Sequence, residues 1–210
     1  MSVPSTHAQQ VPEIVVGRLP IYLRTLIALQ SEGRQFTNSR ELAVALGLSS
    51  AQIRKDFSRF GGFGKQGTGY SVAQLIQQLR DILKLDREWP IILVGAGHIG
   101  SAVANYSGFA HRGFRVVAVF DGSPSRAGER VGNHIIQPMS ALATAVMLQH
   151  VHLALIAVPA HAAQSVADAV VAAGVRAILN YAPVTLAVPH GVHVEYIDPV
   201  LPLQRMTFYL

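Results

Sequence analysis

The most constraining feature of the chain is the segment at residues 90–121, which reads PIILVGAGHIGSAVANYSGFAHRGFRVVAVFD. Its apolar run at 91–94 is short enough to form a β-strand that is buried on both faces. A glycine turn follows at once, then small residues in a helical pattern at 101–104, and a second apolar run at 116–120 that ends on Asp121. The order of strand, glycine turn, helix, strand and acid predicts the βαβ unit of a dinucleotide-binding domain.

Each glycine of the turn has a separate role in this motif. Gly95 permits the tight turn, Gly97 lets the backbone approach a pyrophosphate, and Gly100 lets the helix pack closely against the strand. The free N–H groups at the start of the helix then face the phosphate charge. Asp121 follows about 20 residues later and can accept bonds from both ribose hydroxyls, which favours NAD over NADP. The six residues of the predicted turn are Gly95, Ala96, Gly97, His98, Ile99 and Gly100.

The distribution of charge divides the chain into two parts. Residues 1–85 contain ten Lys or Arg against five acids, whereas residues 86–210 contain seven against seven. The net charge of +5 therefore belongs to the first part, which suggests a nucleic-acid-binding domain attached to a neutral one. Polar residues at 86–88 mark the boundary, so we predict domains at 1–85 and 86–198, followed by a terminal amphipathic helix at 199–210.

The basic part contains the pattern of a helix-turn-helix. A first helix at about 20–31 precedes a capped helix at 40–46, a glycine, and a further helix at 51–60. The helix at 51–60 has an apolar face and a polar, basic face, which suits the major groove of DNA. A solvated basic face is the commoner meaning of such a pattern, but the position after a helix and turn favours DNA. The residues predicted to contact DNA are Ser50, Gln52, Arg54, Lys55, Ser58 and Arg59.

A glycine-rich segment follows the helix-turn-helix. Five glycines lie in the ten residues at 61–70, and Phe63 and Tyr70 flank Lys65. After a helix-turn-helix, this composition predicts the tight hairpin of a winged helix, with Lys65 as a further DNA contact. A helix at 72–85 follows the hairpin.

From residue 90 onward strands and helices alternate, which predicts an α/β domain with a mainly parallel sheet covered by helices on both faces. Strands are expected at 91–95, 115–120, 134–137, 152–158, 175–180 and 192–197, and helices at 98–111, 140–148 and 161–173. Ligands of such sheets bind beyond the carboxyl ends of the strands. The residues of the later turns that we expect at the cofactor are Val158, Pro159, Asn180, Ala182 and Pro183.

The composition argues against catalysis. The chain has no cysteine and residues 86–210 have no lysine, which excludes thiol nucleophiles and, in that part, lysine bases and Schiff bases. Eight of the nine histidines lie at 98–193, yet none has the spacing of a zinc site. Apolar runs end well before the roughly 18 residues of a membrane span. We therefore predict a nucleotide that is sensed rather than used, with neither metal nor membrane involved.

Further motifs extend along the whole chain. They are RLPxY at 18–22, AQIRKDFS at 51–58, FGGFG at 60–64, GTGY at 67–70, YSGF at 106–109, FD at 120–121, AVPA at 157–160, AQ at 163–164 and LNYAPV at 179–184. With the glycine turn, they make the chain similar to the Rex family of redox-sensing transcriptional repressors from about residue 11 to residue 210.

The resemblance implies an α/β fold with an N-terminal winged-helix DNA-binding domain, a Rossmann-type parallel-sheet domain and a C-terminal helix swapped between subunits. It implies a homodimer in the cytoplasm that binds double-stranded, inverted-repeat operator DNA and leaves it when NADH replaces NAD. In such proteins the residues matching Arg18, Tyr106 and Asp198 link the DNA-binding head, the nicotinamide pocket and the swapped helix.

The chain departs from the family pattern at two places. His98 stands in the glycine turn where asparagine is usual, and Pro199, Val200 and Pro202 replace the Leu, Ser and Glu that usually follow the aspartate. The first change affects the nucleotide turn and the second the swapped helix.

Two functions compete at this point. The first is an NADH-responsive, DNA-binding repressor. The second is a small NAD- or CoA-binding enzyme module whose basic N-terminal domain has another role. The two differ in whether an inverted-repeat duplex binds the protein and is released by NADH.

Overall fold

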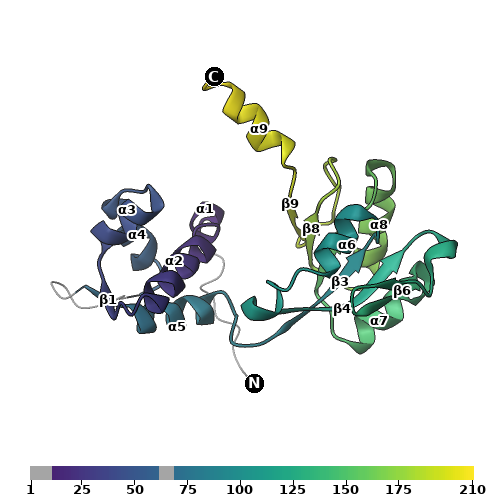
Figure 1. The fold of residues 1–210 in the computed structure, drawn as a ribbon, viewed down its shortest axis with the longest axis horizontal. Helices are drawn as coiled ribbons and strands as arrows, with labels where there is room; N and C mark the ends of the chain where they lie inside the picture. Colours follow the sequence, from purple (N-terminus) through teal and green to yellow (C-terminus); the bar gives the residue numbers. More distant parts are fainter. Residues whose placement is uncertain (1–10, 62–68) are drawn as a thin grey trace. The chain divides into compact units, whose positions relative to one another are not determined.

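The computed structural model describes residues 11–61 and 69–210. The chain forms two compact units that divide between Asp86 and Arg87 (Figure 1). Each unit has hydrophobic core residues of its own.

Local signals in the sequence explain where helices of the N-terminal unit begin and end. The Asn38 side chain accepts bonds from two backbone N–H groups of the helix that follows, and Gly47 ends that helix with a φ of 65°. Ser49 caps the next helix by accepting a bond from the Gln52 N–H. The elements are α1 Glu13–Val16, α2 Leu19–Ser31, β1 Phe36–Thr37, α3 Ser39–Leu46, α4 Ser50–Ser58, β2 Tyr70–Ser71 and α5 Val72–Ile82.

The predicted helices of this unit are confirmed, although α4 and α5 end two and three residues earlier than expected. The short helix α1 and the strand β1 were not predicted. β1 pairs antiparallel with β2, which follows the glycine-rich segment. Residues 62–68, which include Lys65 and most of the predicted hairpin, lie outside the described residues.

The core of the N-terminal unit is formed by α2, α3, α4 and α5. Leu19, Tyr22 and Leu26 of α2 are completely buried. By length and composition alone, Glu13–Ser31 could also cross a membrane; in this structure one side of α2 packs in the hydrophobic core of the unit.

The C-terminal unit is a seven-stranded sheet with helices on both faces (Figure 1). The strand order is β5-β6-β4-β3-β7-β8-β9, with all neighbours parallel except β5 and β6. The strands are β3 Trp89–Val94, β4 Phe114–Asp121, β5 Arg130–Val131, β6 His134–Pro138, β7 Leu153–Ile156, β8 Ala177–Asn180 and β9 His193–Tyr196; the α-helices are α6 His98–Ala104, α7 Leu142–Leu148, α8 Ala160–Ala172 and α9 Val200–Thr207.

The central strand β3 contributes to two cores. Ile92 and Val94 pack with residues of α7 and α8, whereas Ile91 and Leu93 pack in the cluster that contains Val103 of α6. This alternation is the reason why the whole run 91–94 is apolar, since both faces of the strand are covered.

Three expectations for this unit need correction. The predicted helix at 98–111 ends at Ala104, because the Asn105 side chain donates a bond to the Ser101 carbonyl and the chain then turns through a short 3₁₀ helix, Ala110–Arg112. Strand β5 was missed because it has only two residues. The terminal helix predicted at 199–210 is shorter, since α9 spans Val200–Thr207.

Every residue of helix α9 is exposed. It extends away from the sheet (Figure 1), and none of its residues is buried. Leu201, Leu203 and Met206 are each more than half exposed, and so are Phe208 and Leu210 beyond it. So many exposed apolar side chains in one short helix and the residues after it are typical of a protein interface.

Candidate functional site

The three glycines of the turn have three different surroundings. Gly95 has a φ of +100°, and a Cβ there would overlap the Ala157 carbonyl at the end of β7. A Cβ at Gly100 would overlap the Gly95 carbonyl oxygen, so this position brings α6 close to β3. A Cβ at Gly97 would meet no described atom within 4 Å. The turn is therefore crowded inside and open at Gly97, where a ligand could approach the backbone.

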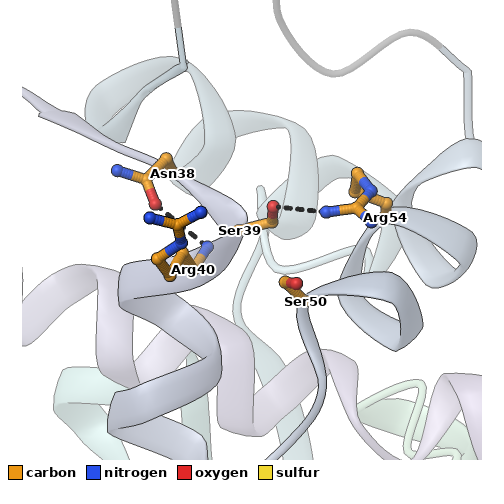
Figure 2. Close-up of a pocket in the computed structure, with 5 residues that line it drawn as sticks. All are labelled: Asn38, Ser39, Arg40, Ser50 and Arg54. Atoms are coloured by element: carbon orange, nitrogen blue, oxygen red, sulfur yellow. Dashed lines mark hydrogen bonds between the residues drawn. The ribbon is translucent and has the colours of Figure 1, made fainter.

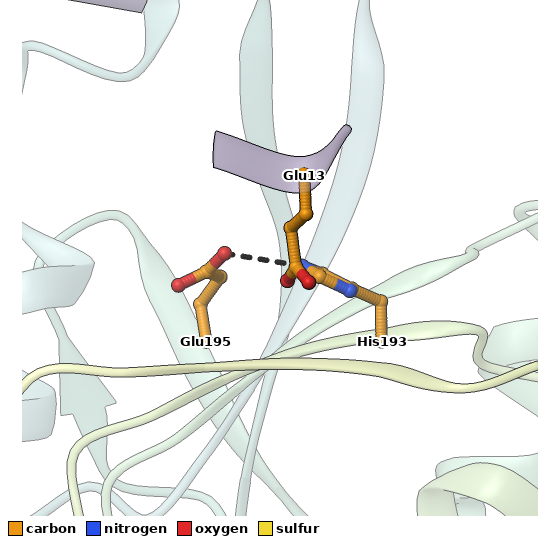
Figure 3. Close-up of side chains that lie close together, drawn as sticks. All are labelled: Glu13, His193 and Glu195. Atoms are coloured by element: carbon orange, nitrogen blue, oxygen red, sulfur yellow. Dashed lines mark hydrogen bonds and ion pairs between the residues drawn. The ribbon is translucent and has the colours of Figure 1, made fainter. Parts of the chain in front are cut away.

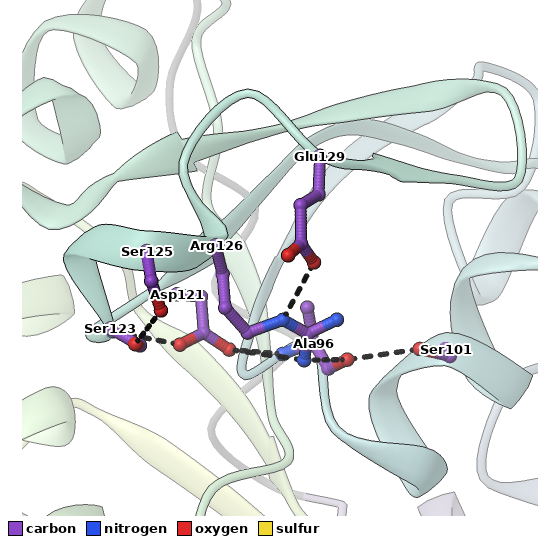
Figure 4. Close-up of polar contacts among 7 residues, drawn as sticks. All are labelled: Ala96, Ser101, Asp121, Ser123, Ser125, Arg126 and Glu129. Atoms are coloured by element: carbon purple, nitrogen blue, oxygen red, sulfur yellow. Dashed lines mark hydrogen bonds and ion pairs between the residues drawn. The ribbon is translucent and has the colours of Figure 1, made fainter.

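The backbone of Ala96 is held from both sides (Figure 4). Its N–H donates to Oδ2 of Asp121 at 2.8 Å, and its carbonyl accepts from Nη1 of Arg126 at 2.6 Å and from Oγ of Ser101 at 2.9 Å. The other oxygen of Asp121 accepts from the Ser123 N–H at 2.9 Å. The end of β4 thus fixes the shape of the glycine turn.

Arg126 is a site residue that the sequence reasoning missed. Its Nε donates to Glu129 at 3.1 Å, and its Nη1 lies 3.9 Å from Oδ2 of Asp121. The available signal was its position in the loop after Asp121, which begins at the carboxyl end of the strand where ligands of such sheets bind.

The later turns lie along the same edge of the sheet. Val94, Ile156 and Asn180 are paired residues of three neighbouring parallel strands, so the segments after them are adjacent. Val158 and Pro159 lead into α8, and Pro159 is its N-cap.

The Asn180 side chain forms hydrogen bonds within the turn that follows β8. Its buried amide donates to the carbonyls of Ala182 and Val184 at 3.1 and 3.0 Å and accepts from the Ala182 N–H at 3.0 Å. A contact of this side chain with a cofactor stays a prediction, whereas its role in placing Ala182 and Pro183 follows from these bonds.

Other predicted residues are exposed and available. His98, the first residue of α6, and Ile99 are exposed. Tyr106 is 49% exposed, stacks edge-on against Phe109, and accepts a bond from Nη1 of Arg112 at 3.3 Å. His193 and Glu195, which were not among the predicted residues, are exposed on the edge strand β9 and pair with each other at 3.1 Å (Figure 3).

In the N-terminal unit, the predicted DNA-contacting residues of α4 differ in exposure. Arg54, Lys55, Ser58 and Arg59 are exposed, whereas Ser50 and Gln52 are half-buried. Arg54 also lines an open hollow between the starts of α3 and α4, where its Nη1 donates to Oγ of Ser39 at 3.1 Å (Figure 2). The residues that line this hollow are Asn38, Ser39, Arg40, Ser50 and Arg54.

Asn38, Ser39 and Arg40 were absent from the predicted set. The sequence reasoning used the helix pattern of α4 alone, and only the packing of α3 on α4 brings these residues beside Arg54. Two arginines and several hydrogen-bonding groups around an open hollow suit a phosphate oxygen of a nucleic acid backbone.

An ion pair between Arg18 and the buried carboxylate of Asp56 joins α4 to the start of α2. Nε and Nη2 of Arg18 donate to the two carboxylate oxygens of Asp56 at 2.6 and 2.8 Å, and the Tyr22 hydroxyl and Gln52 amide donate at 2.6 and 2.7 Å. Burial raises the pKa of Asp56, but the bonds from Arg18, Tyr22 and Gln52 outweigh it and hold that pKa below its usual value. Burial, and then the bond to Asp56, raise the pKa of Tyr22.

The depressed pKa gives this network a defined pH dependence. A carboxylate whose pKa is lower in the folded than in the unfolded protein stabilises the fold at every pH above its pKa in the unfolded protein. That contribution is lost as the pH falls through the folded pKa of Asp56.

The chain was compared with known proteins. A family model for a CoA binding domain matches residues 86–184, and one for the N-terminus of a putative DNA-binding protein matches residues 10–58. Redox-sensing transcriptional repressors Rex of Roseiflexus sp. and Chloroflexus aggregans are each 49% identical, over 96% and 97% of this chain and 92% and 96% of their own. The Rex of Streptomyces coelicolor is 45% identical over 98% of this chain and 80% of its own.

The chain belongs to the Rex family. The fold agrees with this assignment, since a crystal structure of RSP, a Rex-family repressor, in complex with β-NAD⁺ and operator DNA matches with a TM-score of 0.90 and 34% identity over 95% of this chain and 92% of that one. RSP in complex with β-NADH matches with a TM-score of 0.86 and 32% identity, over 95% and 94%. The expectation of a transcriptional repressor is confirmed, and the alternative of a small enzyme module is set aside.

The crowding around the glycine turn of this Rex-family chain gives a paired prediction. Gly100→Ala should lower the free energy of unfolding of the C-terminal unit by roughly 1–3 kcal/mol, because its Cβ overlaps backbone at the end of β3. Gly97→Ala should change it by less than about 1 kcal/mol, because the space is open. Urea unfolding of both variants tests this, and equal losses would contradict the packing role of Gly100.

Proposed function

We propose that this chain represses transcription by binding operator DNA through its N-terminal unit and leaves the operator when NADH replaces NAD in its C-terminal unit. The observation that carries the proposal is the presence, in one chain, of an exposed basic helix α4 and of a glycine turn braced by Asp121. The likeness to RSP, which was crystallised with NAD⁺ and operator DNA and with NADH, supports it. As a DNA-binding repressor, the protein acts in the cytoplasm.

The direct experiment is a gel shift with an inverted-repeat duplex at fixed salt. We expect a shifted band that persists with NAD and is lost as NADH replaces it. A shifted band that NADH does not change would support DNA binding but contradict the proposed release by NADH.

The DNA-binding part of the proposal rests on the exposed face of α4. Arg54, Lys55, Ser58 and Arg59 face solvent there, and we assign them to the DNA together with Ser50 and Gln52 at its edge. Lys65 completes the set from the glycine-rich segment. Base edges are read by the few residues that enter the groove, and the remaining cations contact phosphates.

Lys55→Ala and Arg59→Ala should each weaken operator binding and, where the contact is to phosphate, lower the slope of log affinity against log salt by about one. NADH affinity should stay unchanged, because the cofactor site lies in the other unit. Arg24→Ala, which removes an exposed arginine of α2, is the control. Equal loss of operator and NADH affinity in the α4 variants would contradict the division of roles.

The cofactor part of the proposal rests on the edge of the sheet. We assign NAD and NADH to the turn Gly95–Gly100, with Asp121 at the adenosine ribose. Tyr106 is assigned to the nicotinamide. The remaining contacts are assigned to Val158, Pro159, Asn180, Ala182 and Pro183.

Asp121→Ala should weaken NADH binding by roughly 1–3 kcal/mol, the scale of hydrogen bonds to a charged group. It should also relax the rejection of NADPH, because the 2′-phosphate no longer meets a carboxylate. Calorimetry with both nucleotides measures the two effects. Asp121→Asn keeps an acceptor for the Ala96 N–H, so it separates the loss of charge from a distortion of the turn. If both variants kept the wild-type preference for NADH over NADPH, Asp121 would not belong to the site.

The dimer part of the proposal rests on α9. Its exposed apolar side chains would be covered by a partner subunit if the helix is swapped, and Asp198 would then lie near the partner's head. In this chain Oδ1 of Asp198 accepts a bond from the Val200 N–H at 2.9 Å. We propose that Arg18, Tyr106 and Asp198 form the link between cofactor and DNA, as the family resemblance implies.

Deleting residues 199–210 should convert the dimer to monomers or aggregates, because the surface that α9 covers on its partner becomes exposed. Operator affinity should fall as well, since half-sites about 34 Å apart need two heads held together. Light scattering and operator titration measure the two outcomes. A stable dimer after truncation would contradict the swapped helix.

A further inference from the structure

The Asp56 carboxylate joins the helix that faces DNA to the helix that begins at Arg18. Asp56 belongs to α4, and its side chain is 1% exposed, while that of Arg18, the N-cap of α2, is 18% exposed. The carboxylate accepts bonds from Arg18, Tyr22 and Gln52. Arg18 is thus the cation that compensates a charge held inside the unit.

Arg18 can act on this carboxylate from the surface of the unit. Its guanidinium uses Nε and Nη2 on Asp56, and a guanidinium has a third nitrogen that can donate elsewhere. A second acceptor that drew Arg18 away would leave Asp56 buried without its cation, a state that strongly destabilises a folded protein. α4 would then have to move so that the carboxylate reaches water or another donor.

The carboxylate is also connected to the surface that we assign to DNA. Gln52 bonds to Asp56 at 2.7 Å and lies at the edge of the exposed face of α4. The ring of the neighbouring Phe57 packs edge-on against two tyrosine rings. Its centroid lies 5.3 Å from that of Tyr22 and 5.5 Å from that of Tyr70 in β2. A change at Asp56 would therefore reach both α4 and the strand that follows the glycine-rich segment.

We propose that Asp56 is the positioning residue through which Arg18 sets α4 for DNA: the Arg18–Asp56 pair is intact on the operator and loosened in the NADH-bound dimer. This inference rests on the proposed function, and it adds to it the element inside the head that responds. The competing explanation is that the pair only stabilises the head and has the same geometry with either cofactor.

The test measures a release factor, defined as the operator Kd with saturating NADH divided by the operator Kd without it, on the full chain. The wild type should give a factor of at least about five, the lower end of ordinary allosteric couplings. Asp56→Asn should bind the operator more weakly without NADH, and its release factor should be smaller. The double variant Arg18→Gln with Asp56→Asn leaves neither charge of the pair, so it should be more stable to thermal unfolding than Arg18→Gln alone, which keeps the buried carboxylate without its cation.

Tyr22→Phe is the matched control, because it removes a bond to the same carboxylate without touching Arg18. It should lower the midpoint of thermal unfolding but keep the wild-type release factor. NADH affinity, measured separately, should be the same in all variants. If Asp56→Asn does not fold, Arg18→Lys takes its place, since it keeps the charge and loses the two-pronged contact.

The outcomes separate the inference from the proposed function. A wild-type chain that NADH does not release from the operator would overturn the proposed function, and this inference with it. A wild type that is released, together with an Asp56→Asn variant that folds and keeps the wild-type factor, would overturn the inference alone. So would a Tyr22→Phe variant that loses as much of the factor as Asp56→Asn.

Discussion

A carboxylate removed from water must be matched by donors, and this constraint at Asp56 determines how the N-terminal unit is arranged. Four bonds from Arg18, Tyr22 and Gln52 converge on the two oxygens. Because these donors come from α2 and from α4 itself, the angle between the two helices cannot change without breaking some of them. The exposed basic face of α4 is therefore presented by a rigid, fully bonded interior.

The C-terminal unit uses a carboxylate in a related way. Asp121 accepts bonds from the N–H groups of Ala96 and Ser123, and Arg126 holds the Ala96 carbonyl. The shape of the glycine turn is thus set by the end of the next strand as well as by the glycines. Asp56 fixes the position of α4, whose exposed face we assign to DNA, and Asp121 fixes the turn before α6, which we assign to the cofactor.

Much of this could be predicted from the sequence, because its signals are local. Alternation of apolar runs gave the strands, and capping residues such as Asn38 and Ser49 gave the starts of helices. The prediction was wrong after Ala104, where the apolar pattern continued but the Asn105 side chain capped the Ser101 carbonyl. The two-residue strands β1 and β5 were missed, since they exist only through pairing with β2 and β6.

The sequence by itself determined the two-part organisation, the dinucleotide turn, the basic helix and the family, because each depends on residue type and spacing along the chain. Only the tertiary structure decided that Asp56 is buried against Arg18 and that Arg126 donates a hydrogen bond to the Ala96 carbonyl. It also decided that Ser39 and Arg40 line the same hollow as Arg54. These contacts join residues from different elements. The physical reason is that burial and hydrogen bonding depend on how elements pack, which no periodicity within one element records.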